Sequence, residues 1–141
     1  MPYGYLEHIS DVGIHAEGQS VNEALSCAAE AMLNVMFELP DIKETVDATF
    51  GVESTEIPLL FVEVLNEILS IQDRHSFAFK RLAVKEIKNK DSRWIFIGTV
   101  YGEPFNPDKH AVKTEVKGTT YSGLAYREED GRHIFECVVD V

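Results

Sequence analysis

The sequence predicts an α+β fold, a two-layer sandwich in which a mostly antiparallel β-sheet carries two helices packed on one face. Three observations predict this class. Two segments, one starting at Ser20 and one at Ile57, have apolar residues at helical spacing. The other segments read as strands, which outnumber the helices, and short turns join most of them. The 141 residues fit a single domain, 1–141, without a linker, an internal repeat or a low-complexity tract.

A capping box marks the start of the first helix. The Ser20 hydroxyl can accept a hydrogen bond from the amide of Glu23, three residues on, and the Glu23 side chain can reach back. Apolar residues then recur at helical spacing until Pro40 stops the helix, so we expect it to end at Phe37 or Glu38. We interpret its stripe of Met and Leu as core packing and not as a cofactor groove.

The second helix should run from Ile57 to Ile71, with Pro58 in its first turn. Leucine, isoleucine, valine and phenylalanine form its buried stripe. Glu63 and Glu67 are neighbours on its other side, four residues apart, where we expect a solvated face.

The remaining segments have the apolar–polar alternation or the flanking turn residues that are typical of strands. Two pairs read as hairpins, with turns at 89–92 and 128–131. In 112–121 the charged residues face one way and the valines the other. A turn at 10–12 separates the first two strands, and the predicted strands are 3–9, 13–17, 45–53, 77–87, 94–101, 112–121, 124–127 and 133–139.

The chain is strongly acidic, with 13 Lys+Arg against 24 Asp+Glu and a formal net charge of −11. Nucleic-acid affinity comes largely from Lys and Arg that displace counterions, so we expect no direct, tight binding to RNA or DNA. An acidic surface fits better with a basic protein partner, a bound cation or simple solubility.

Cysteine content and hydropathy indicate where the protein works. Cys27 and Cys137 are too few and too isolated for a disulfide framework or a zinc site, and we interpret them as small buried residues in a reducing compartment. The chain has no Arg-flanked apolar leader and no apolar run near the ~20 residues of a membrane helix. We therefore expect a soluble, cytoplasmic protein without a membrane partner.

Common catalytic motifs are absent from the sequence, including the Walker loop, the dinucleotide fingerprint and the Gly-x-Ser-x-Gly elbow. His8, Asp11 and His15 have the spacing of a metal face on a helix, but this region reads as strand, in which His8 and Asp11 would point to opposite faces. His110 lies in a proline-rich loop, and loops often carry function. From the residues alone we favour the alternative, an exposed and solvated histidine.

Acidic groups near the start and at the finish of the chain are candidate metal ligands. Asp140 and the free carboxylate of Val141 are adjacent in sequence. If folding brings Asp11 alongside them, three negative groups surround one point and repel one another unless a cation lies between them. Carboxylate oxygens without thiolates suit hard ions such as Mg²⁺, Ca²⁺ or Mn²⁺. The alternatives are a purely structural ion or merely exposed charge.

These motifs, taken together and in order, resemble the archease family across essentially the whole chain. The family opens with an acidic residue, His, Thr, Ala, Asp, an aliphatic residue and Gly. This chain departs from the family at Ile9 and Ser10, which replace Thr and Ala, and at Ser122, where a histidine is common. The matching segments are 7–13, 28–32, 65–69 with the nearby Asp73, Gly102-Glu103 with His110, 115–121, and the final Asp140-Val141.

The resemblance implies a function. Archease is a protein cofactor, not an enzyme, that promotes guanylylation and multiple turnover of the RtcB-type tRNA-splicing ligase. It implies a two-layer, mostly antiparallel fold and a divalent metal site made by Asp11, Asp140 and the main-chain carboxylate of Val141. Because Ser122 replaces the usual histidine, no role is carried over to that side chain.

Further residues and two other functions follow from the same reading. We expect His8, His110 and Lys117 to be edge residues that touch the partner or the nucleotide phosphates. One alternative function is a chaperone-like modulator of a tRNA cytosine methyltransferase. The other is a small metal-dependent phosphohydrolase, for which the chain has candidate ligands but few Lys or Arg near them.

Overall fold

The computed structural model describes residues 2–6 and 11–141 of the chain. In this part, the strands form two antiparallel sheets, with the orders β1-β2-β7-β6 and β3-β5-β4. The elements are β1 (Tyr3–Leu6), β2 (Asp11–Gly18), α1 (Val21–Met36), the 3₁₀ helix η1 (Leu39–Asp41), β3 (Val46–Ser54), α2 (Ile57–His75), β4 (Phe77–Lys90), β5 (Arg93–Pro104), β6 (Gly118–Glu129) and β7 (Arg132–Asp140). The predicted α+β class with antiparallel strands and two α-helices is confirmed.

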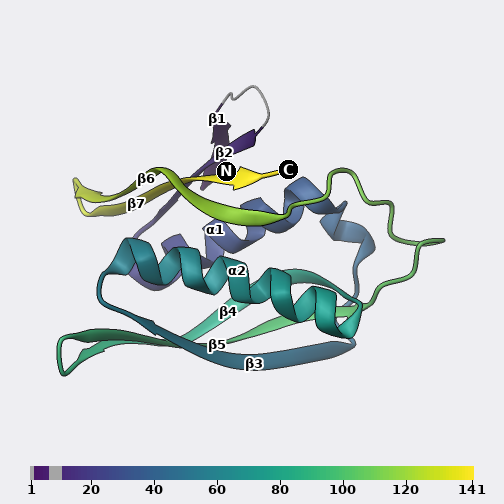
Figure 1. The fold of residues 1–141 in the computed structure, drawn as a ribbon, viewed down its shortest axis with the longest axis horizontal. Helices are drawn as coiled ribbons and strands as arrows, with labels where there is room; N and C mark the ends of the chain where they lie inside the picture. Colours follow the sequence, from purple (N-terminus) through teal and green to yellow (C-terminus); the bar gives the residue numbers. More distant parts are fainter. Residues whose placement is uncertain (1, 7–10) are drawn as a thin grey trace.

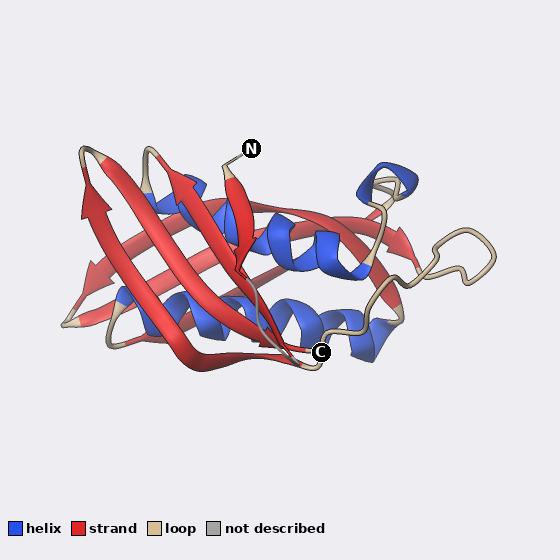
Figure 2. Ribbon diagram, turned by 90° about the horizontal axis from the view of Figure 1, so that it is seen from above, coloured by secondary structure: helices blue, strands red, loops and turns tan. Residues whose placement is uncertain are grey.

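The two helices lie between the two sheets (Figures 1 and 2). Helix α1 contacts β2 and β7 on one side and β4 on the other, and α2 contacts β6 on one side and β3 and β5 on the other. We expected one sheet with both helices on a single face; the structure divides the strands, so each helix buries two sides. No helix in the described residues is long and apolar enough to cross a membrane.

Local sequence signals locate the helix ends and the hairpins. The Ser20 hydroxyl accepts a hydrogen bond from the backbone N–H of Glu23 at 3.1 Å, as the capping box predicts. Helix α1 ends at Met36, one residue before the nearer of the two expected ends, and Phe37 is its C-cap. The β4–β5 hairpin turns on two residues with positive φ, Asp91 at 52° and Ser92 at 64°, the conformation that matches the twist of the flanking strands.

Several predicted boundaries are wrong, and each error concerns pairing or a cap. Helix α2 continues past Ile71 to His75 and is capped by the left-handed Ser76. The expected turn at 10–12 is replaced by the first residues of β2, apart from Ser10, which lies outside the described residues. Segment 112–117 is not a strand despite its alternation, because it has one isolated bridge and, within residues 2–6 and 11–141, no neighbouring strand to pair with along its length.

The core fills the space between the helices and the sheets. The buried Phe61 of α2 has its ring centroid 4.7 Å from that of Phe135 in β7 and 5.8 Å from that of Tyr126 in β6. Cys27 and Cys137 are free and buried, as expected, and burial raises the pKa of the Cys137 thiol to about 12. The aromatic contacts of Phe61 therefore join α2 to the sheet that contains both ends of the chain.

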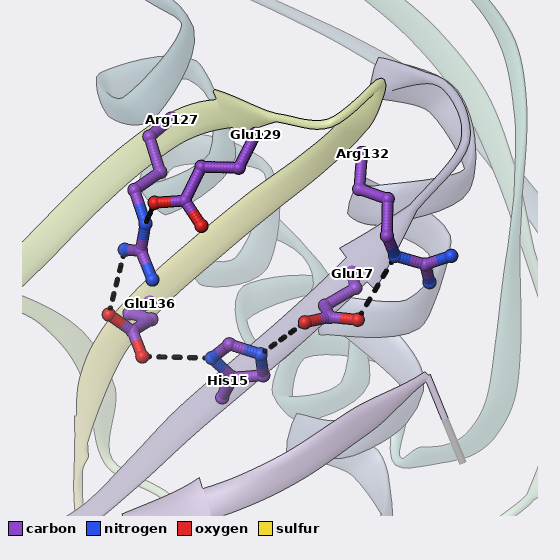
Figure 3. Close-up of polar contacts among 6 residues, drawn as sticks. All are labelled: His15, Glu17, Arg127, Glu129, Arg132 and Glu136. Atoms are coloured by element: carbon purple, nitrogen blue, oxygen red, sulfur yellow. Dashed lines mark hydrogen bonds and ion pairs between the residues drawn. The ribbon is translucent and has the colours of Figure 1, made fainter.

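The outer face of that sheet carries a chain of ion pairs (Figure 3). His15 of β2 lies between two carboxylates, with Nδ1 2.8 Å from Glu136 and Nε2 3.0 Å from Glu17. Arg127 extends the chain from Glu136, and Arg132 extends it from Glu17, each at 3.2 Å. Both ring nitrogens face carboxylate oxygens, so the geometry favours the imidazolium form.

The pKa shifts of these groups have the signs that the contacts require. Partial burial acts to lower the pKa of His15, but the hydrogen bonds to Glu136 and Glu17 outweigh it and raise that pKa above 6.5. The hydrogen bond from His15 lowers the pKa of Glu17 and of Glu136 below 4.5. Between pH 4.5 and pH 6.5, therefore, His15 is protonated, Glu17 and Glu136 are charged, and the ion pairs are complete.

Replacing Phe61 by alanine should destabilise the fold strongly. The change leaves a cavity at the contact between α2 and the sheet, and we expect the free energy of unfolding to fall by about 3–5 kcal/mol. Urea denaturation followed by circular dichroism measures the difference. Tyr121→Ala, at a side chain that is 58% exposed, is the control and should change the free energy by less than about 0.5 kcal/mol.

Replacing His15 by glutamine should change the pH dependence of stability. A raised pKa contributes stability that is fully present below 6.5 and is lost as pH rises through the folded-state pKa, whereas the lowered carboxylate values contribute above 4.5. The difference in Tm between wild type and His15→Gln should be largest between pH 4.5 and 6.5 and smaller at higher pH. A difference that stays constant as the pH is raised to about 9 would contradict this assignment.

Candidate metal and partner-contact site

The structure brings Asp11 and Asp140 together. In the antiparallel pairing of β2 with β7, the first residue of β2 lies directly opposite the last residue of β7, so these two aspartates are cross-strand partners. Directly opposite residues have Cβ atoms about 4.5–5.5 Å apart and point to the same face. That face is the outer one, because the intervening residues Ile14 and Val139 are buried in the core.

This pair differs from the cross-strand pair four residues further along the same two strands. There, His15 lies opposite Glu136 and compensates its charge. Like charges placed directly opposite are destabilising. In the part of the chain that the structure describes, Asp11 and Asp140 take part in no ion pair with a Lys, Arg or His. Within this part of the chain no cationic side chain offsets their repulsion, which a bound cation would relieve.

Val141 continues the line of β7. Its half-buried side chain packs against the core on the same side as Val139, which restrains the backbone directly after Asp140. Among residues 2–6 and 11–141, no three His, Cys, Asp or Glu side chains converge to hold a metal ion. The predicted donor set has two side chains and one main-chain carboxylate, and its all-oxygen chemistry fits a hard cation.

The backbone of Lys117 lies next to that of Asp140. Its N–H donates to the main-chain oxygen of Asp140 at 2.8 Å, and its side chain is exposed. The same side chain lines an open groove of about 870 Å³ between the C-terminal half of α2 and segment 105–117, together with Asp73 and Glu115. His8, the other expected edge residue near Asp11, lies outside the described residues.

His110 does not match the expectation of an exposed edge residue. Its side chain is 1% exposed, and its ring stacks on Phe105 with centroids 5.9 Å apart. The ring Nδ1 accepts a hydrogen bond from the backbone N–H of Asn106 at 2.9 Å, so the ring proton is assigned to Nε2. Nε2 lies 3.0 Å from the Glu103 carboxylate. Both nitrogens are engaged, and in this conformation the ring holds the 105–110 loop instead of facing a partner.

Glu103 is the central residue of a cluster with Lys43, Lys109 and His110, which we call the loop anchor. The hydrogen bond from Lys109, the backbone N–H of Lys43 and the contact with His110 lower the pKa of Glu103 to about 2. The carboxylate therefore stays charged at all physiological pH values. Together with His110 it ties the loop after β5 to the chain before β3.

Sequence reasoning missed one residue near the site, Asn66. In the sequence it belongs to the helical motif 65–69, and in the structure its side-chain amide pairs with the backbone of Thr119 at the start of β6. No pattern in the sequence indicates this contact, because the two residues belong to a helix and a strand that meet only in the folded protein.

Comparison with known proteins shows the family to which the chain belongs. A model of the Archease protein family (MTH1598/TM1083) matches residues 3–141. Protein archease of Pyrococcus furiosus is 34% identical over 138 residues, covering 97% of this chain and 96% of that protein. Protein archease of Methanopyrus kandleri is 30% identical over 141 residues and covers 100% of both chains.

A solved structure shares the same fold. The solution structure of Methanobacterium thermoautotrophicum protein 1598 superimposes with a TM-score of 0.88 at 26% identity, covering 99% of each chain. The family match spans nearly all of the sequence, and the relatives match over nearly their full lengths. This chain therefore belongs to the archease family.

Proposed function

We propose that this protein is a non-catalytic cofactor of an RtcB-type tRNA-splicing ligase, promoting guanylylation and multiple turnover of that enzyme. Membership of the archease family supports the partner. The observation that carries the proposed site is the register of β2 and β7, which sets Asp11 against Asp140 on the solvent-facing side of the sheet.

The proposed site holds a divalent hard cation, Ca²⁺, Mg²⁺ or Mn²⁺. Asp11, Asp140 and the main-chain carboxylate of Val141 would be its protein ligands. When bound, the ion supplies positive charge that offsets the repulsion between the carboxylates and leaves coordination positions for an external oxygen ligand. The chain's own contribution is to hold the donors at one end of the sheet, where they are open to a partner.

Charge determines which surface of the ligase fits this end. A protein with a net charge of −11 is repelled by RNA phosphates and attracted to a basic protein surface. Lys117, beside Asp140, offers an ammonium group that suits a nucleotide phosphate, and His8 is the second proposed contact on the Asp11 side. We propose that this acidic end faces the basic, nucleotide-binding region of the ligase.

The residues of this end do not favour an enzyme of its own. A phosphohydrolase needs a positioned base and a cationic clamp for the phosphate, in addition to a metal. Among the described residues, Lys117 is a basic residue beside Asp140, to which its backbone N–H donates. Both ring nitrogens of His110 already have hydrogen-bond partners, the backbone N–H of Asn106 and the carboxylate of Glu103. Assaying the protein alone with Mn²⁺ against generic phosphoesters tests this part of the proposal, and robust turnover would contradict it.

Replacing either aspartate should abolish stimulation of the ligase without unfolding the protein. Asp11→Asn and Asp140→Asn keep the side-chain shape but each removes one negative charge. In an assay with a purified RtcB-type ligase, GTP and Mn²⁺, we expect GMP attachment to fall to the level that the ligase reaches without this protein. The metal-free variants should be as stable as wild type, or more so, because the like-charge repulsion is relieved.

A matched control is Asp47→Asn, an exposed aspartate on β3 in the other sheet. It removes the same charge at a distance from the proposed site and should leave stimulation unchanged. Full stimulation by both site variants would refute the metal-site role, and loss of stimulation by Asp47→Asn would point to a general effect of net charge.

Extending the chain beyond Val141 should weaken the site in a different way. A short Gly-Ser tail converts the Val141 carboxylate into a neutral amide and moves the charged terminus away from the site, while every side chain stays intact. We expect weaker Mn²⁺ binding by calorimetry and reduced ligase stimulation. Unchanged binding in the extended protein would exclude Val141 as a ligand, whereas Asp11 and Asp140 could still be tested separately.

A further inference from the structure

Strand β6 lies at the edge of its sheet, so no other described strand pairs with its outward backbone groups. At Thr119 the side chain of Asn66, on α2, occupies that place. The Thr119 N–H donates to Asn66 Oδ1 at 2.7 Å, and Asn66 Nδ2 donates to the Thr119 carbonyl oxygen at 3.3 Å. One side-chain amide thus pairs with both backbone groups of a single residue, as a partner strand would.

Thr119 is also held from its other side. Its side chain is among the few buried polar ones, with 6% of the residue exposed, and its hydroxyl lies 3.8 Å from the sulfur of Met32 in α1. Thr119 therefore contacts both helices, and β7 pairs with it through Val139. This makes it a fixed point at the start of β6.

The fixed point adjoins the proposed metal site. Gly118 is the cross-strand partner of Asp140, and Lys117 donates its N–H to the Asp140 carbonyl at 2.8 Å. The residues before Lys117 do not form a strand, so the first tether of this strand on the α2 side is the one made by Asn66. The position of Lys117 against Asp140 consequently depends on the position of Thr119.

We propose that Asn66 is a positioning residue of this site: by pairing with Thr119 it holds Lys117 and Asp140 in register. The inference rests on the proposed metal site. Asn66 does not contact the ion; it restrains the strand that flanks one ligand. Replacing groups that orient a metal ligand typically weakens metal binding by about 10-fold to 100-fold.

The test compares Asn66→Leu with Thr119→Val. Leucine has the same branched shape as asparagine, with two bulkier methyl groups in place of the oxygen and the NH2, and it neither donates nor accepts. It therefore removes both hydrogen bonds to Thr119. Valine at 119 removes only the weak hydrogen bond to the Met32 sulfur. Its added methyl group still fills the buried position against Met32, and the backbone groups that Asn66 binds are kept. The two variants thus perturb the same place, but only one removes the pairing.

Two readouts are measured on each protein: the affinity for Mn²⁺ by calorimetry and the hydrogen exchange of the Lys117 and Thr119 amides by NMR. We expect Asn66→Leu to bind Mn²⁺ about 10-fold more weakly and to lose protection at both amides. Thr119→Val should retain the affinity and the protection. Asn66→Ala is the second variant if the leucine disturbs packing, with thermal unfolding as the check on folding.

The outcomes separate this inference from the function on which it rests. Wild-type affinity in folded Asn66→Leu and Asn66→Ala would overturn the positioning role and leave the metal site standing. An equal loss of affinity in Thr119→Val would also overturn it, because any perturbation of β6 would then suffice. Absence of Mn²⁺ binding by the wild-type protein would overturn the metal site itself, and the positioning role with it.

Discussion

The antiparallel pairing of β2 with β7 is the constraint on which the candidate site depends. It joins the first long strand of the chain to the last one (Figure 1), and its register places Asp11 opposite Asp140. Side chains alternate between the faces of a sheet, so a slip of one residue would turn both the core residues and the aspartates to the wrong side. The buried residues Ile14, Phe135 and Val139 therefore set the register that the two acids need.

The outer face of this sheet has two kinds of cross-strand charge pair, one of opposite charges and one of like charges. At His15 and Glu136, opposite charges face each other and two arginines extend the pairing. At Asp11 and Asp140, like charges face each other at the end of the same strands. The first arrangement stabilises the sheet, and the second stores repulsion that binding of a cation would relieve. The stabilising pair His15–Glu136 and the proposed metal ligands Asp11 and Asp140 thus lie four residues apart on the same face of the sheet.

Three polar side chains around the site hydrogen-bond to backbone groups: the buried Glu103 and His110 and the half-buried Asn66. Glu103 and His110 hold the loop after β5, and Asn66 holds the start of β6. Between these two anchors runs segment 112–117, which ends at Lys117 beside Asp140. Within the described residues the segment has no partner strand along its length, so it is held at its two ends. Backbone hydrogen bonds join Lys113 to Met36 and Lys117 to Asp140, and the side-chain contacts of His110 and Asn66 fix the residues just outside the segment.

The sequence by itself determined the local features of this protein: the capping box at Ser20, the two amphipathic helices, the tight hairpins, the acidic charge and the ordered motifs of the family. These depend on neighbouring residues, so they can be recognised without a fold. Only the tertiary structure decided the division into two sheets, the unpaired segment 112–117, the burial of His110 and the pairing of Asn66 with Thr119. Each of these depends on contacts between residues far apart in the chain, and alternation or spacing carries no information about which distant segment supplies the partner.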